Sequence, residues 1–377
     1  MPRRHGFLHM IKIIEKSFGT KYRAAVISDT HGSYSLLRRL LERDEVKSAG
    51  HTVFNGDHIS RGRERLACLR FLMDLEGREN VTVIKGNLER LVNWYITAEP
   101  EGILRHFRGH SYNLFRECME EQNAGPINEK TFPSLRKLFM EKYPDIIKYC
   151  AGLPNALETE DLVFTHAGLG AHENWRDSTE QEVMKNDPFI HVGVNTTGKW
   201  LVCGHMPTWN SKHSGNSNNC YVDEGRKMVF TDGGNQVKDF AQLNALIING
   251  DCGSLSFNTV FESWYPVFFA SKKWEADADY GCEKDHWPEG ELEIVSRGED
   301  FTLCRREDGS LMYLNNGHAS FVGNTACILR NTVSSMLSVE AGERLELLDS
   351  PGGRYILVRK ENGLIGWVDG GVLLGDR

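Results

Sequence analysis

Three segments decide the fold: SDTHG at residues 28–32, GDHISRG at residues 56–62 and GNLE at residues 86–89. Each follows a short apolar run that predicts a β-strand, at residues 24–27, 52–54 and 81–84. Helical patterns at residues 36–45 and 64–75 separate these runs. The alternation of strand and helix predicts an α/β fold with a largely parallel sheet and right-handed crossovers.

Polar residues gather where the predicted strands end. Asp29, Asp57 and Asn87 are 28 and 30 residues apart, which is about one strand–helix unit each. The carboxyl ends of parallel strands meet at one edge of a sheet, and open α/β sheets bind ligands there. Two later predicted strands, 162–165 and 200–203, also end in histidine-containing segments. The side chains expected to converge on one rim are Asp29, His31, Asp57, Asn87, His166 and His205.

Oxygen and nitrogen donors without a thiolate suit manganese, iron, zinc or nickel better than calcium. Six donors are too many for one ion that must also hold substrate. Two ions about 3.5–4 Å apart, bridged by one carboxylate, form the arrangement that clamps a phosphoryl group during displacement. Arg61 adds a planar fork for phosphate oxygens.

Taken singly, these residues have simpler structural explanations. Asp29 or Asn87 would serve as a helix cap, His166 or His205 as a hydrogen-bonded core histidine, and Arg61 as a surface arginine. Their occurrence together, in order and beside glycines, favours a two-metal site. Asp232, in the segment TDGG at residues 231–234, is expected to form a turn.

Five blocks of the sequence resemble those of calcineurin-like metallophosphoesterases, especially the PPP-type serine/threonine protein phosphatases and their bacterial relatives. The blocks are Asp29-x-His31, Gly56-Asp57-x-x-Ser60-Arg61-Gly62, Gly86-Asn87-x-Glu89, His166-Ala167-Gly168 and Gly204-His205. The resemblance covers about residues 22–250. It implies a metallophosphoesterase β-sandwich flanked by helices.

The resemblance also implies roles for individual residues. Asp29 and His31 would hold the first ion, Asp57 would bridge, and Asn87, His166 and His205 would hold the second ion. Arg61 and Asn87 would contact the phosphoryl group, and a hydroxide between the ions would be the nucleophile. With Asp57, these two residues form the expected catalytic set. Two divalent ions are the expected cofactors, with manganese favoured over iron, zinc or nickel.

Two positions depart from the family pattern. Leu88 stands where the third block usually has a histidine that protonates the leaving oxygen, and Ser60 stands where an aspartate orients that histidine. Loss of a general acid typically costs about 10²- to 10⁴-fold in rate. His58 and His110 are candidates for a substitute acid.

Three functions follow from these observations. The resemblance favours a serine/threonine protein phosphatase-like phosphomonoesterase, with a phosphorylated protein or a small phosphoester as substrate. The missing acid pair makes a phosphodiesterase or nucleotide pyrophosphohydrolase the alternative. A second alternative is a weakly active, metal-bound scaffold that binds phosphoproteins.

The chain of 377 residues is long enough for two domains. We expect an N-terminal extension at 1–21, a metallophosphoesterase domain at 22–250 with a helical insertion at 88–150, and an irregular connector at 251–289. Residues 290–377 are expected to form a small all-β barrel. Their segment NGLIGWV at 362–368 resembles bacterial SH3-like domains, whose ligand would be a peptide or the catalytic domain itself.

Composition narrows the class of protein further. The net charge of −8, from 44 basic and 52 acidic residues, argues against broad nucleic-acid binding. Nine cysteines without a Cys-x-x-Cys pair do not form a disulfide or thiolate-zinc pattern. The first residues lack an export pattern, and no apolar run approaches the ~20 residues that span a bilayer. We expect a cytoplasmic, bacterial protein that does not bind membranes.

Overall fold

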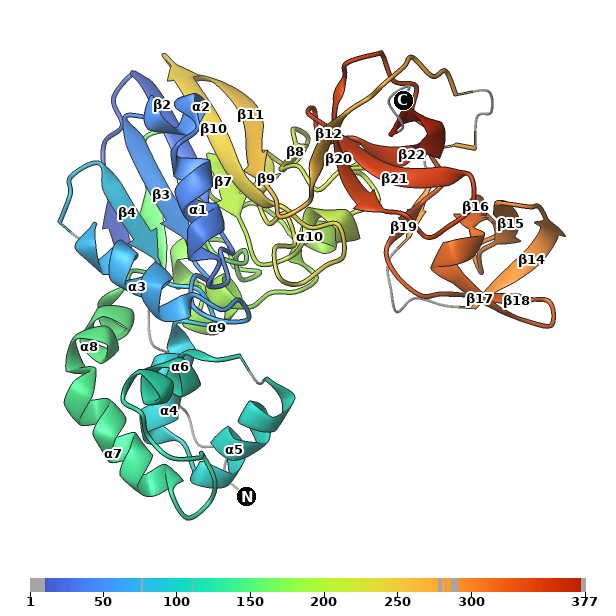
Figure 1. Cartoon of the computed structure of the whole chain (residues 1–377). Helices are drawn as coiled ribbons and strands as arrows, with labels where there is room; N and C mark the ends of the chain where they lie inside the picture. The colour runs from blue at the N-terminus through green and yellow to red at the C-terminus, as the bar shows by residue number, and fades with distance from the viewer. Residues whose placement is uncertain are drawn as a thin grey trace. The chain divides into compact units, whose positions relative to one another are not determined.

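The computed structural model describes residues 11–373 except 76, 111, 277–279, 282 and 286–290. The chain divides into two compact units (Figure 1). The α/β unit comprises residues up to Thr208 together with Asn219–Val237 and Gln242–Glu262. The β unit comprises Trp209–Asn218, Lys238–Ala241 and the residues from Ser263 onward. Two short segments of the β unit therefore interrupt the α/β unit in the sequence.

One sheet of the α/β unit has five strands in the order β11-β10-β2-β3-β4. The central strands β2, β3 and β4 are parallel, and β10 and β11 add two antiparallel strands at one edge. The three runs expected as strands are thus confirmed. The bounds are Lys21–Ile27 for β2, His51–Asn55 for β3, Val81–Ile84 for β4, Leu243–Asp251 for β10 and Ser254–Glu262 for β11.

The second sheet of this unit has six strands in the order β1-β5-β6-β7-β9-β8. Strands β6, β7 and β9 are parallel, so their carboxyl ends also share one edge. Strand β1 lies within residues 1–21, where only an extension was expected, and it pairs with β5. The bounds are Ile13–Glu15 for β1, Ala156–Glu158 for β5, Leu162–Thr165 for β6, Trp200–Cys203 for β7, Tyr221–Asp223 for β8 and Met228–Phe230 for β9.

The two sheets pack face to face around a shared apolar core. Ala24 and Val26 of β2 lie in one buried cluster with Phe164 of β6 and Val202 of β7. The alternate residues of β2 face the other way, into the cluster that the helices cover. Because β2 is buried on both faces, its sequence is an almost uninterrupted apolar run. The α/β unit is therefore a mixed α/β fold built on a sandwich of two sheets.

Helices cover both outer faces of this sandwich. Residues 88–150 contain most of a group of five helices, α4 to α8, which lie together beyond one end of the strands (Figure 1). Aromatic side chains of these helices belong to the same buried cluster as Ala25 and Ile27 of β2. The helix bounds are Tyr34–Leu41 for α1, Asp44–Lys47 for α2, Arg65–Asp74 for α3, Arg90–Thr97 for α4, Pro100–Gly109 for α5, Leu114–Glu121 for α6, Phe132–Lys142 for α7, Pro144–Gly152 for α8, Glu180–Met184 for α9 and Phe189–Val192 for α10.

In its described residues the β unit contains strands and short 3-10 turns. One sheet has the order β16-β15-β14-β18-β17, another has β12-β20-β21-β22, and β13 pairs with β19. The bounds are Val267–Phe269 for β12, Lys284–Asp285 for β13, Glu291–Arg297 for β14, Phe301–Arg305 for β15, Leu311–Asn315 for β16, Ala319–Val322 for β17, Thr325–Ile328 for β18, Thr332–Val333 for β19, Arg344–Asp349 for β20, Tyr355–Lys360 for β21 and Ile365–Asp369 for β22.

The expectation of an irregular connector at 251–289 is wrong for its first part. Residues 254–262 form β11, the edge strand of the five-stranded sheet, and residues 267–269 form β12 of the β unit. In the first six residues of β11, exposed and partly buried side chains alternate. One face of the strand packs against the apolar core and the other faces solvent. Residues 277–279, 282 and 286–290 of this range lie outside the described residues.

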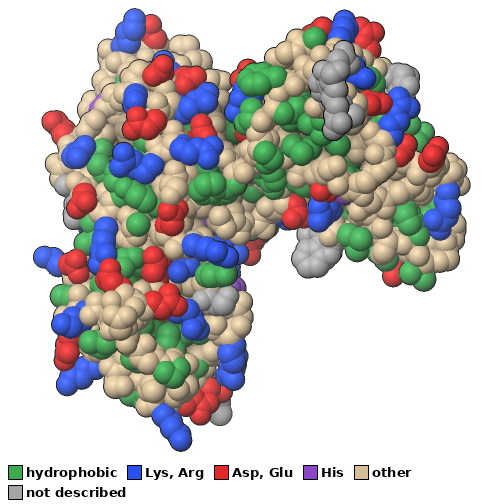
Figure 2. All heavy atoms as spheres, in the orientation of Figure 1, with side chains coloured by type: hydrophobic (Ala, Val, Ile, Leu, Met, Phe, Trp, Pro, Cys, Tyr) green, Lys and Arg blue, Asp and Glu red, His purple; other side chains and the backbone are tan. Residues whose placement is uncertain are grey.

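The surface charge, the cysteines and the length of the helices bear on the class of protein. Acidic and basic side chains are interspersed over the face drawn in Figure 2. The eight described cysteines are all free thiols. Among the described residues, none of the helices combines the length and apolar character that crossing a bilayer requires.

Candidate metal centre

The predicted ligands sit directly beyond the ends of parallel strands. Asp29 follows β2 and Asp57 follows β3, while β4 leads into Asn87. In the other sheet, His166 follows β6 and His205 follows β7. Because the strands within each sheet are parallel, the loops of each group leave their sheet at one edge. The two edges lie on the same side of the sandwich, since Asp57 lies close to His166 and His205.

The backbone at these positions adopts an unusual conformation. Asp29, His31, Asp57 and His205 have φ angles of +53°, +46°, +58° and +68°, and Arg61 has +65°. Side chains rarely adopt this left-handed region, and such strain concentrates at functional sites. Five of the ten non-glycine residues with positive φ in the described chain are thus predicted site residues.

Two glycines allow the ligands to pack closely. A Cβ atom on Gly56 would lie 2.5 Å from Nδ1 of His166, and one on Gly86 would lie 2.3 Å from the backbone N of Asp57. Gly56 also has a φ of +86°. Any side chain at either position would push a candidate ligand out of place.

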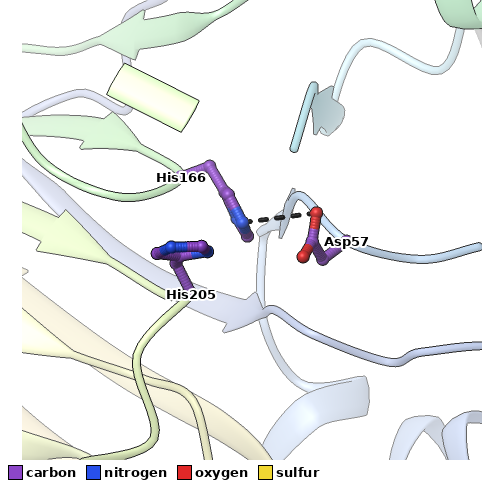
Figure 3. A group of neighbouring side chains, drawn as sticks. All are labelled: Asp57, His166 and His205. Carbon is purple, nitrogen blue, oxygen red and sulfur yellow. Dashed lines mark ion pairs between the residues drawn. The ribbon is translucent and has the colours of Figure 1, made fainter. Parts of the chain in front are cut away.

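The side chains form two groups that share Asp57. The donor atoms of Asp29, His31 and Asp57 all lie within 4.8 Å of one another, and so do those of Asp57, His166 and His205. Figure 3 shows the second group, in which the His166 ring points at Asp57. Its Nε2 lies 3.3 Å from Asp57 Oδ1. This is the arrangement expected of two ions that share one carboxylate.

Several buried polar atoms of these two groups, and of Asn87 and Asp232 near them in the fold, have no hydrogen-bond partner within the described residues. They are Asp29 Oδ1, His31 Nδ1, Asn87 Oδ1, His166 Nε2 and Asp232 Oδ2. Buried polar atoms without partners are rare in proteins because each one costs free energy. Divalent cations would satisfy such donors, so the residues present fit a metal centre.

Neighbouring groups orient two of the histidines. Nδ1 of His166 lies 2.9 Å from the carbonyl oxygen of Asn55, which leaves Nε2 directed at Asp57. Nε2 of His205 lies 2.8 Å from Asp187 Oδ1, which leaves Nδ1 as its free nitrogen. Hydrogen bonds of this kind set the tautomer of a metal-ligating histidine.

Glu89 is a site residue that was not in the predicted set. Its Oε2 accepts hydrogen bonds from the backbone N–H groups of Asp57 at 3.0 Å and Gly86 at 2.8 Å, and its Oε1 accepts one from His58 at 2.7 Å. This buried carboxylate therefore fixes the backbone that carries Asp57. Its only signal in the sequence is its place in the GNLE block.

Burial and neighbouring charges shift the pKa values of the candidate ligands. Burial and the charge of Asp232 raise the pKa of Asp29 well above its ordinary value. Burial would also raise the pKa of Asp57, but His166 and His31 lower it overall. Burial lowers the pKa of His31 to about 3, which keeps its imidazole neutral, as a metal ligand must be.

The candidate substitute acids are not placed to act. His58 is buried, its Nδ1 lies 3.1 Å from Thr30 Oγ1, and its Nε2 accepts the N–H of Gly56 at 3.1 Å. Burial lowers its pKa to about 3. Both ring nitrogens of His58 are thus engaged, one with the Thr30 hydroxyl and one with the Gly56 N–H, and this argues against His58 as the substitute acid. His110 ends α5 with its ring 4.5 Å from that of His106, and no contact joins it to the ligands among the described residues.

Leu88, Ser60 and Arg61 differ in their burial and in their contacts with the ligands. Leu88 packs against the apolar cluster of the helical insertion, and its N–H donates to Asp57 Oδ1 at 2.9 Å. Ser60 is buried. Arg61 is exposed, and its charge acts on both His31 and Asp232. An arginine side chain is thus available beside the cluster.

The chain matches one family of known proteins and is similar to several solved structures. Residues 22–251, more than half of the chain, match the model of the calcineurin-like phosphoesterase family. A protein serine/threonine phosphatase from Saccharomyces cerevisiae is 13% identical over 68% of this chain and 85% of its own, with a TM-score of 0.41. A cold-active protein-tyrosine phosphatase of a psychrophilic Shewanella is 16% identical over 66% and 82%, with a TM-score of 0.39. A metallophosphoesterase from Sphaerobacter thermophilus is 15% identical over 64% and 88%, with a TM-score of 0.38.

Proposed function

The chain belongs to the calcineurin-like phosphoesterase family, and from this premise we propose that it is a dinuclear metal-dependent hydrolase of phosphate esters. The proposed reaction is that of a serine/threonine protein phosphatase-like phosphomonoesterase. Manganese is the proposed metal, since the donors are oxygen and nitrogen atoms.

The unpartnered donor atoms carry the proposal. Asp29 and His31 would hold one ion, Asp57 would be shared, and Asn87, His166 and His205 would hold the other ion. Four of these six residues contribute a buried atom that has no hydrogen-bond partner within the described residues: Asp29, His31, Asn87 and His166. Of these atoms, His166 Nε2 faces Asp57 Oδ1 at 3.3 Å. The bound ions would polarise the phosphoryl oxygens and lower the pKa of the attacking water.

Side chains and backbone groups of the protein would bind the phosphoryl group and hold the ligands in place. Arg61 would bind two phosphoryl oxygens through its planar fork, and the Asn87 amide would contact the phosphoryl group. Glu89 keeps Asp57 in place through its hydrogen bond to the Asp57 backbone. The Asn55 carbonyl keeps the His166 ring turned toward Asp57.

Proton supply to the leaving group is the weak step. Leu88 and Ser60 occupy the positions of the family's acid pair, and His58 is committed to Thr30 and Gly56. Good leaving groups such as aryl oxides need no proton donor. This observation favours, as a second candidate, a phosphodiesterase or nucleotide pyrophosphohydrolase.

A substrate panel tests the function. The protein is loaded with manganese and assayed on p-nitrophenyl phosphate, bis-p-nitrophenyl phosphate and a phosphoserine peptide. The monoesterase proposal expects the first to be hydrolysed fastest and the peptide slowly. A strong preference for the diester would replace it with the second candidate. Metal uptake without turnover of any substrate would support a phosphoprotein-binding scaffold instead.

We propose further that the β unit is an SH3-like module that contacts a peptide or the catalytic domain. Support comes from the Asn362-Gly363 hairpin turn between β21 and β22. Trp367 in that motif is fully buried and donates its Nε1–H to the Val333 carbonyl at 2.8 Å. It is a core residue, so the ligand would bind elsewhere on the unit. The proposed compartment is the cytoplasm, which keeps free thiols reduced.

A further inference from the structure

Asp232 occupies a ligand-like position that the proposed function does not use. It follows β9, which pairs in parallel with β7, and Phe230 lies opposite Cys203. Asp232 and His205 each lie two residues beyond this pair. The side chain of Asp232 therefore leaves the sheet at the same edge as a candidate ligand, although its sequence context indicates only a turn.

Two hydrogen bonds hold Asp232 close to Asp29. On one side, Thr231 Oγ1 lies 2.8 Å from Ser28 Oγ. On the other side, Asn235 Nδ2 donates to the Thr30 carbonyl at 2.8 Å. The contacts flank both aspartates, so they keep the two loops in register.

The two carboxylate oxygens of Asp232 differ. Oδ1 accepts the N–H of Gly234 at 2.7 Å, which accounts for the expected turn. Oδ2 has no partner within the described residues, and the side chain is only 1% exposed. A buried carboxylate oxygen without a donor, next to two further buried carboxylates, Asp29 and Asp57, is unfavourable unless positive charge is added.

We propose that Asp232 is an outer-sphere carboxylate of the first metal ion, accepting through Oδ2 a hydrogen bond from a water molecule that the ion binds. Asp232 is not part of the group whose donor atoms lie within 4.8 Å, which is Asp29, His31 and Asp57. It therefore acts through water and not as a direct ligand. The inference rests on the proposed function, because it assumes that the first ion binds.

The role has two consequences. Without metal, Asp232 adds like charge beside Asp29 and destabilises the fold. With metal, the same charge strengthens binding, and loss of an outer partner typically weakens metal affinity by about 10- to 100-fold. Metal affinity and metal-free stability should therefore change in opposite directions when the charge is removed.

Asp232→Asn tests this, because the amide oxygen can still accept from Gly234. Asp223→Asn is the matched control, since Asp223 Oδ1 accepts from Arg226 N at 3.0 Å in another turn of the same sheet. Calorimetric titration with Mn²⁺ and melting curves with and without Mn²⁺ are recorded for the wild type and both variants. Asp232→Ala, which also loses the turn contact, separates the two effects.

We expect Asp232→Asn to bind one ion as the wild type does and the other about 10-fold or more weakly. Its metal-free melting temperature should rise, and the increase caused by Mn²⁺ should shrink. Asp232→Ala should show the same metal defect with a lower metal-free melting temperature than Asp232→Asn, and Asp223→Asn should bind metal normally. Unchanged affinity at both sites overturns the inference, and so does a weaker site together with a lower metal-free melting temperature in Asp232→Asn. If the wild type binds no metal, the proposed function itself fails.

Discussion

Two clusters of histidine and aspartate, one in each unit, differ in whether their polar atoms have partners and in the conformation of their backbone. In the β unit, His318 is buried, with Nδ1 3.2 Å from Thr332 Oγ1 and Nε2 2.9 Å from Asp349 Oδ2. Asp349 also accepts from Arg330 at 2.6 Å. In the α/β unit, Asp29 and His31 each keep a buried atom without a partner among the described residues.

The comparison separates stability from binding. Both ring nitrogens of His318 have partners and its φ is not positive, as expected of a network that serves the fold. The candidate metal centre combines unpartnered atoms with a strained backbone, and neither would persist unless a ligand or the surrounding fold compensated for it. A buried histidine is therefore a candidate ligand when a ring nitrogen is left over, and burial alone does not identify one.

The largest expected effect comes from Asp57→Asn. The amide can keep the hydrogen bond from Leu88, but the carboxylate shared by both groups is lost. We expect bound metal to fall from two ions to at most one, and hydrolysis of p-nitrophenyl phosphate to fall on the order of 10³-fold. Metal analysis by mass spectrometry and steady-state kinetics check this. Two tightly bound ions in the variant would break the comparison.

Restoring the acid pair should have the next largest effect. Leu88→His together with Ser60→Asp is expected to speed hydrolysis of a phosphoserine peptide by up to about 10²-fold, because that leaving group needs a proton. Hydrolysis of p-nitrophenyl phosphate should change little, and it serves as the internal control. Equal gains on both substrates would show that the change acts on the metal centre and not on proton supply.

Asp349→Asn tests the satisfied cluster. We expect the free energy of unfolding in urea to fall by about 1–3 kcal/mol, with metal content unchanged. Burial opposes ionisation of Asp349, but its bond to His318 and the charge of Arg330 lower its pKa overall. Its stabilising effect is therefore present above the unfolded pKa of about 3.9 and is lost as the pH falls through the lower folded value. The stabilities of the variant and the wild type should start to approach each other near pH 4 and converge only below the folded pKa of Asp349.

The smallest effect is expected from Arg61→Lys. Lysine keeps the charge but cannot bind two phosphoryl oxygens at once, so kcat/KM should fall about 10-fold. Metal stoichiometry should stay at the wild-type value, because Arg61 is not in either group of donors. A loss of metal in this variant would mean that Arg61 supports the loop and does not contact substrate.

The sequence predicted most of the sandwich because its central strands are buried on both faces. Residues 24–27 are a continuous apolar run for this reason, residues 243–248 are apolar except for Asn244, and both are strands. Strand β11 was missed because its alternating residues look irregular, and β1 was missed because it has only three residues. Edge strands carry a weaker pattern than central ones.

The sequence predicted those site residues that directly follow a strand. The six expected ligands were identified by their place after strands, and the structure brings Asp29, His31, Asp57, His166 and His205 into two groups. Roles that depend on hydrogen-bond partners were not visible. The sequence does not show that Glu89 accepts from backbone N–H groups, nor that both nitrogens of His58 are already engaged.

The interrupted course of the β unit limits how this protein can be taken apart. Trp209, four residues after His205, and Phe240, eight residues after Asp232, both belong to the buried cluster that contains Trp367. Arg359 donates to the Phe240 carbonyl from within a buried ion pair with Glu346. A gene fragment that ends at residue 262 lacks Trp367 and Arg359. The loops that follow His205 and Asp232 would then lose the contacts that hold Trp209 and Phe240 in place. Any transplant of the catalytic half into another protein would have to bring the β half along or redesign those two loops.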